Sequence, residues 1–71
     1  MDNTISVIVY EKSEDGSLRA IDERTWTTAM VVSLEHVNYI TIGNQEYKTL
    51  EGRLNLDTGM LEILVVAMRN E

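Results

Sequence analysis

Residues 54–66, LNLDTGMLEILVV, have the pattern of two strands joined by a tight turn. Thr58-Gly59 suits a two-residue hairpin loop, because glycine tolerates the positive φ that such a turn needs. This loop predicts that Leu54 pairs with Ile63, which gathers the large apolar side chains on one face. A three-residue loop would place Leu54 opposite an acid, since a slip of one residue exchanges the two faces. The pattern therefore favours the two-residue loop.

A second hairpin is predicted just upstream, within YITIGNQEYKTL at residues 39–50. Gly43-Asn44 suits a type II′ turn with glycine first, and this turn pairs Ile40 with Tyr47. Tyr47 is odd-numbered, whereas Leu54 and Leu56 are even-numbered. If all three belong to one core, an extra residue between them must shift the phase. We expect a bulge at Gly52, which would also curve the sheet.

The N-terminal stretch, residues 5–21, predicts a third hairpin around Asp15-Gly16. A tight two-residue loop would place Glu11 opposite Ala20. A wider loop pairs Tyr10 with Leu18, and the apolar pattern favours this wider loop.

Residues 22–36, DERTWTTAMVVSLEH, allow two interpretations. Asp22 is a suitable helix cap, and apolar residues follow it at helical spacing. Five β-branched residues oppose a helix, because their side chains lose χ1 freedom there. We expect an irregular or short helical segment near residues 22–30, with a turn to about Thr28 and a strand from Ala29 to Leu34.

Composition places the chain in the all-β class, as one small domain over residues 1–71. Val, Ile, Thr and Tyr are abundant, which favours strands. We expect an antiparallel meander or a partly open barrel of five to six strands. A chain of this length has a thin core, and the absence of cysteine excludes disulfide support. Good packing or a partner subunit must supply the stability.

Charge limits the classes of partner. The chain has 12 acidic residues against 6 Lys and Arg, a net charge of −6. This balance disfavours nucleic acid as a partner, because phosphate contacts need a basic surface. The N-terminus lacks the features of a secretory signal, and the longest apolar run is far too short to cross a membrane. We therefore expect a cytoplasmic protein with no membrane contact.

The sequence offers no catalytic signature. His36 is the single histidine and stands beside Glu35. Adjacent residues of a strand point to opposite faces, so the two would not form a general-base pair. With one histidine and no cysteine, a transition-metal site has little support. We expect no catalytic residue, no metal, no cofactor and no enzymatic activity.

Two strands are apolar on both faces. In MLEILVVAM, residues 60–68, only Glu62 interrupts the second face, and ISVIVY behaves in the same way. A strand with one solvent-exposed face should alternate between apolar and polar residues. A helix, a tightly curled sheet or a second copy of the chain must cover the second face. A homodimer is favoured, with an interface formed by the residues of that face: Ile8, Tyr10, Met60, Leu64, Val66 and Met68.

The function expected from these features is that of a small non-enzymatic interaction or regulatory module. It would be a homodimer that binds another protein, and Trp26 would anchor a partner if its loop were exposed. Two alternatives stay open. One is an acidic inhibitor that imitates nucleic acid on a basic protein. The other is a small β-barrel that binds nucleic acid through its aromatic residues.

Overall fold

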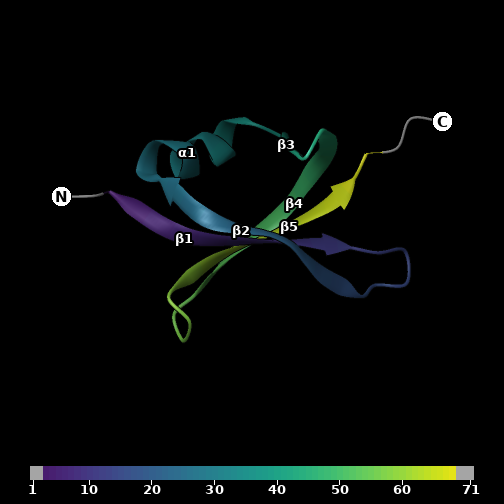
Figure 1. Ribbon diagram of the computed structural model, residues 1–71, viewed down its shortest axis with the longest axis horizontal. Helices are drawn as coiled ribbons and strands as arrows, with labels where there is room; N and C mark the ends of the chain where they lie inside the picture. The colour runs from purple at the N-terminus through teal and green to yellow at the C-terminus, as the bar shows by residue number, and fades with distance from the viewer. Residues whose placement is uncertain (1–2, 69–71) are drawn as a thin grey trace.

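A computed structural model describes residues 3–68 as one five-stranded sheet with a short helical segment on one side (Figure 1). The elements in chain order are β1 Thr4–Lys12, β2 Leu18–Thr27, α1 Thr28–Ser33, the 3-10 turn Leu34–His36, β3 Tyr39–Ile42, β4 Gln45–Asn55 and β5 Met60–Ala67. The strand order across the sheet is β2-β1-β5-β4-β3. The sheet curls into a half-barrel, which confirms the small all-β, partly open barrel predicted from the sequence.

The two strands that are apolar on both faces are the neighbouring strands in the middle of the sheet. β1 and β5 pair in parallel, with Val7 opposite Leu61 and Val9 opposite Ile63. All other pairs are antiparallel, so the sheet is mixed and not a purely antiparallel meander. Parallel neighbours need a long connection, and here β2 to β4 supply it. Apolar side chains on both faces are typical of such central strands.

The core lies on the face of the sheet that α1 covers. Val7, Val9 and Val65 are completely buried, and Ile63 and Trp26 complete the buried cluster. Val31 and Leu34 of the helical segment pack against this cluster. The helix is therefore held by the burial of one apolar side, which compensates for the low helix propensity of its β-branched residues.

The strand expected from Ala29 to Leu34 is wrong. Strand β2 continues to Thr27, and the helix follows at once. Thr27 caps it, because its side-chain Oγ1 accepts a hydrogen bond from the backbone N of Met30 at 3.2 Å. The short helical segment that the sequence allowed is present, but it begins at Thr28, later than Asp22 would have placed it.

The β4–β5 hairpin is confirmed with a longer loop than predicted. Asn55 pairs with Met60, so the loop holds four residues and Leu54 lies opposite Leu61 instead of Ile63. The side-chain amide of Asn55 organises this loop, since its Oδ1 accepts hydrogen bonds from the backbone N atoms of Asp57 and Thr58. The shift is two residues, an even number, so the side chains keep their predicted faces.

The predicted phase shift in β4 occurs, but at Leu50 and not at Gly52. The register against β5 changes between Thr49 and Glu51, which leaves Leu50 as the extra residue of a bulge. No glycine is required there, because Leu50 takes a backbone conformation with negative φ.

The β3–β4 hairpin has the predicted register, with Ile40 opposite Tyr47. Its turn is of a different type. Gly43 and Asn44 both have positive φ, of 56° and 67°, which defines a type I′ turn. In the N-terminal hairpin the wide loop is confirmed, but Tyr10 pairs with Ala20 and not with Leu18.

Candidate interaction surface

We define the open face as the side of β1, β5 and β4 opposite to α1. The parallel register sets Ile8 beside Glu62 and Tyr10 beside Leu64 on this side. Met60 and Val66 join them by the alternation of side chains along β5. Met68 follows the strand directly, with its backbone N bonded to the carbonyl oxygen of Glu46. The fold thus brings the six residues of the predicted interface to one side of the sheet.

Side chains of the open face are half-buried by their neighbours within the sheet. Ile8, Tyr10, Met60, Leu64 and Val66 all have intermediate exposure, and Met68 is 36% exposed. Within residues 3–68 the α-helix lies on the other face, so no second layer covers this one. Leu18 and Leu50 on the flanking strands are 52% and 45% exposed and extend the apolar surface.

Glu62 stands in the middle of this surface and is only 9% exposed. Arg53 donates to its carboxylate, with Nε at 2.7 Å and Nη2 at 2.6 Å from Oε1. Asn55 donates from Nδ2 to Oε2 at 3.1 Å. These hydrogen bonds, chiefly that from Arg53, hold the pKa of Glu62 below its ordinary value, against the smaller opposing effect of burial.

The sequence did not reveal the Arg53–Glu62 pair. The predicted two-residue loop places Asn55 opposite Glu62 and Arg53 opposite Leu64. The observed four-residue loop moves Arg53 to the position opposite Glu62. The available signal in the sequence was that Arg53 and Glu62 lie on the same face of the predicted hairpin. In the predicted register Arg53 is two positions away from the place opposite Glu62.

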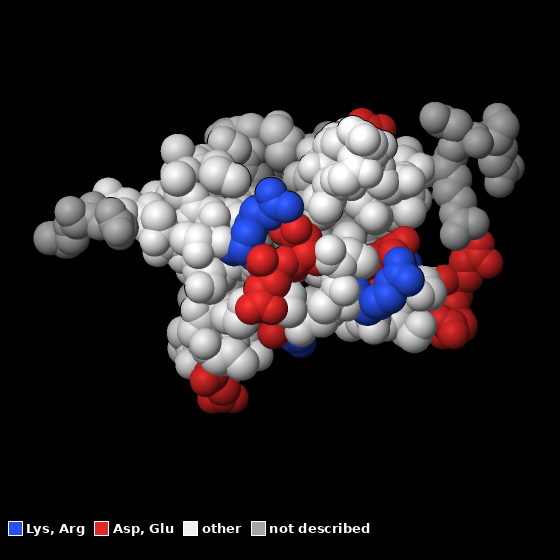
Figure 2. All heavy atoms as spheres, in the orientation of Figure 1, with Lys and Arg blue, Asp and Glu red and all other residues white. Residues whose placement is uncertain are grey.

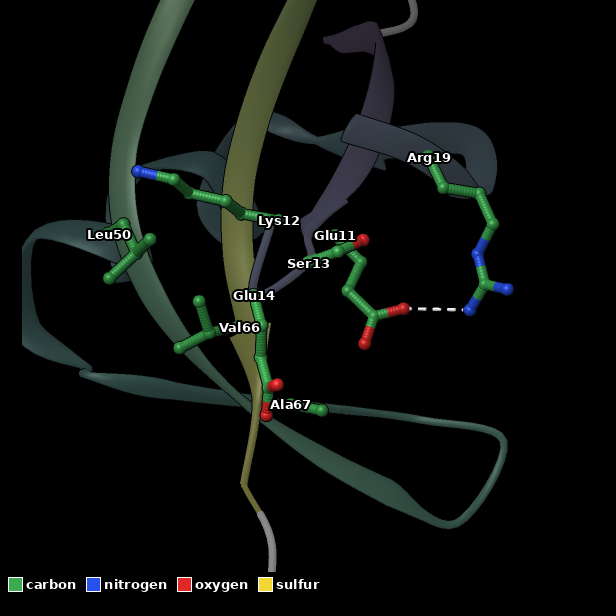
Figure 3. A pocket seen from close by; sticks show the side chains of 8 residues that line it. All are labelled: Glu11, Lys12, Ser13, Glu14, Arg19, Leu50, Val66 and Ala67. Atoms are coloured by element: carbon green, nitrogen blue, oxygen red, sulfur yellow. Dashed lines mark hydrogen bonds and ion pairs between the residues drawn. The ribbon is translucent and has the colours of Figure 1, made fainter. Parts of the chain in front are cut away.

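A hollow of about 690 Å³ lies where the β1–β2 loop approaches β4 and β5. Figure 3 shows Leu50 and Val66 on one side of it and the Glu11–Arg19 ion pair on the other. The Nη2 of Arg19 lies 2.8 Å from Oε1 of Glu11. The hollow therefore combines an apolar wall with a charged rim, a combination found at protein interfaces.

Trp26 does not lie in an exposed loop, which its expected role as an anchor for a partner would require. It lies in β2 and is 8% exposed, so its ring belongs to the core. Among the described residues its buried indole Nε1 has no hydrogen-bond partner. The ring also lines a groove of about 310 Å³ between the helical segment and β3, together with Met30, Leu34 and Ile40.

Acidic residues form separate groups interspersed with Arg and Lys on the face drawn in Figure 2. Three acids are neutralised by arginines: Glu11 by Arg19, Asp22 by Arg24, and Glu62 by Arg53. A continuous carboxylate surface of the kind that imitates a phosphate backbone is not visible on this side of the molecule.

His36 and the acidic residues do not form a metal cluster in the part of the chain that the structure describes. His36 is exposed at the end of the 3-10 turn. Over residues 3–68 there is no group of three or more His, Cys, Asp and Glu side chains placed to hold a metal ion. The same residues contain no helix with the length and apolar character needed to cross a membrane.

Comparison of the chain with models of known protein families, with curated proteins and with solved structures finds no match.

Proposed function

We propose that this chain is a non-enzymatic interaction module that forms a homodimer through its open face and binds another protein. The observation that supports the proposal most strongly is the position of the helix. The chain uses its helical segment to cover one apolar face, and the apolar residues of the two central strands on the other face are left without a covering layer. Soluble monomers rarely expose contiguous apolar patches of this kind.

Packing of a second copy would complete the burial of these side chains. A fully buried aliphatic side chain contributes roughly 1.5–3 kcal/mol, and those of the open face are so far half-buried. Glu62 does not oppose this contact, because Arg53 and Asn55 already satisfy its carboxylate. Burying a paired and hydrogen-bonded charge avoids the large cost of burying an unpaired one.

The partner protein would be one with a basic surface. A net charge of −6 accelerates encounter with such a surface and disfavours nucleic acid. The absence of cysteine is compatible with the cytoplasmic location that the sequence predicts.

Sedimentation of a matched pair of variants tests the self-association. Val66→Lys introduces a charge on the open face, whereas Val32→Lys introduces the same charge at an exposed valine of α1. We expect Val66→Lys to shift the mass towards that of smaller species. Val32→Lys should sediment like the wild type, because residue 32 is 53% exposed on the opposite side.

Circular dichroism would establish that both variants fold. A folded Val66→Lys variant that sediments like the wild type over the micromolar range would refute the open-face contact. An equal loss of mass in both variants would also refute it, since the added charge would then act in the same way wherever it lies on the surface.

A further inference from the structure

The outer edge of β4 is only partly covered by a neighbouring strand. Strand β3 pairs with Gln45–Lys48, and the backbone N of Thr49 bonds to the carbonyl oxygen of Asn38. Beyond this point, among the described residues, no strand pairs with that edge from Leu50 to Asn55. In Figure 1 this end of the β4–β5 hairpin projects away from β3 and from the helix. An unpaired edge offers free N–H and C=O groups to another strand.

Residues 50–54 of this edge, Leu-Glu-Gly-Arg-Leu, are all exposed. Leu50 and Leu54 are 45% and 56% exposed, and the side chain of Arg53 is 72% exposed. Glu51 forms no ion pair within residues 3–68. Charges of one sign on an edge repel a second copy of the same edge. This edge instead carries one acid and one base on either side of a glycine.

The segment is complementary to itself when it is turned by 180°. In an antiparallel pair centred on Gly52, Glu51 lies opposite Arg53 of the second copy, and Arg53 lies opposite Glu51. Leu50 lies opposite Leu54 in the same register. Glu51 and Arg53 point to the open face, as their partners Leu64 and Glu62 show. Opposite charges placed directly across an antiparallel pair stabilise it.

We propose that two copies of this chain pair their β4 edges antiparallel over residues 50–54, with the two-fold axis at Gly52. The occupant of the edge is thus a second copy, selected by the Glu51–Arg53 charge pairs. Arg53 keeps its bonds to Glu62 in this arrangement, because those bonds use Nε and Nη2 and leave Nη1 free for the second copy. Together with the open face, each chain then has two self-complementary surfaces, and assembly extends beyond a dimer.

Disulfide trapping tests the position of the axis, since the chain has no cysteine of its own. A Cβ at residue 52 would lie 3.6 Å from Cδ1 of Ile63 and 3.8 Å from the backbone oxygen of Glu62, both ordinary contact distances. We expect Gly52→Cys to form a covalent dimer under mild oxidation, because directly opposite residues of an antiparallel pair come within disulfide range.

Leu56→Cys is the matched control. Leu56 is 83% exposed, so its thiol is more accessible than one at residue 52. The proposed register nevertheless separates the two copies of residue 56 by roughly 27 Å. We expect Leu56→Cys to stay monomeric on a denaturing gel. A monomeric Gly52→Cys, or equally fast dimer formation by the two variants, would overturn the proposal.

A charge reversal tests whether the Glu51–Arg53 pairs select the second copy. Glu51→Lys in the Gly52→Cys background replaces two attractive pairs with two repulsive ones, and we expect crosslinking to slow by about tenfold. Glu46→Lys makes the same change on the part of β4 that β3 covers, and it should leave the rate unchanged. Equal crosslinking rates for the two variants would show that the Glu51–Arg53 charge pairs do not contribute to the pairing of the edges.

The edge contact and the open-face contact can fail separately. Val66→Lys should lower the mass in sedimentation and leave the crosslinking of Gly52→Cys intact. If Val66→Lys abolishes that crosslinking, the edges do not pair independently and the proposal is overturned.

Discussion

Arg53 and Glu62 face each other across β4 and β5, with Nε of the guanidinium 2.7 Å from Oε1 of the carboxylate. The pair lies beside the apolar side chains that β1 and β5 present on the open face, and it explains how an acid is tolerated among them. Its partner Asn55 also organises the hairpin loop, so one cluster connects the loop with the open face.

Stability should depend on the ionisation of Glu62. Its pKa is lowered in the folded state by the hydrogen bonds from Arg53 and Asn55, so the ionised form stabilises the fold. This contribution is present above the ordinary pKa of 4.5 and is lost as the pH falls through the lower folded value. We expect the difference in Tm between wild type and Glu62→Gln to be largest near pH 6 and to shrink in acid. A difference that stays constant with pH would contradict this assignment.

Replacing Trp26 separates the effect of its ring from that of its N–H. Trp26→Ala should lower the free energy of unfolding by about 3–5 kcal/mol, because it leaves a cavity in the core. Trp26→Phe keeps an aromatic ring and removes the unpartnered donor, so we expect a change of only about 1 kcal/mol. Urea unfolding followed by circular dichroism measures both. An equally large loss in Trp26→Phe would show that the N–H has a partner in the folded protein.

The two glycines of β4 and its turn should respond in opposite ways to alanine. Gly43 has φ of +56°, where a Cβ is strained, so Gly43→Ala should cost about 1–2 kcal/mol. Gly52 has no such constraint and space for a Cβ, so Gly52→Ala should leave stability unchanged or raise it by about 0.5–1 kcal/mol. Thermal unfolding distinguishes these outcomes. A large loss in Gly52→Ala would show that the edge of β4 is more crowded than the structure indicates.

The N-cap of α1 offers a further test. Thr27→Ala removes the acceptor for the backbone N of Met30 and should destabilise the protein by about 1 kcal/mol. Thr27→Ser keeps the hydroxyl and should recover most of this loss. Equal destabilisation by both substitutions would mean that the methyl group of Thr27, and not its hydroxyl, supports the helix.

Local signals in the sequence were sufficient for β1, β3, β4 and β5, but not for the second half of β2 or for the helix that follows it. Gly43-Asn44 determines a two-residue loop, and the predicted register of that hairpin is the observed one. The wider loops around Asp15 and Thr58 determine the register less strictly. The β4–β5 hairpin is displaced by two residues. The N-terminal hairpin is displaced by two residues at Tyr10 and by three beyond the bulge between Val9 and Tyr10. The even displacement of the β4–β5 hairpin preserves its faces, so the side chains of β5 lie on the faces predicted for them although their cross-strand partners differ.

Features that depend on distant parts of the chain were not predictable. The parallel pairing of β1 with β5 brings residues 7–11 next to residues 61–65, and no local pattern encodes it. The helix at 28–33 has low intrinsic propensity and is stabilised by packing of Val31 on the core. The Arg53–Glu62 pair and the free edge of β4 depend in turn on the register and on the short length of β3.

Sedimentation equilibrium of the wild-type chain tests whether a second copy covers the open face. We expect, at tens of micromolar, a mass of at least twice the 8.1 kDa of a single chain, falling on dilution. A mass of 8.1 kDa over the whole concentration range, without aggregation, would contradict it.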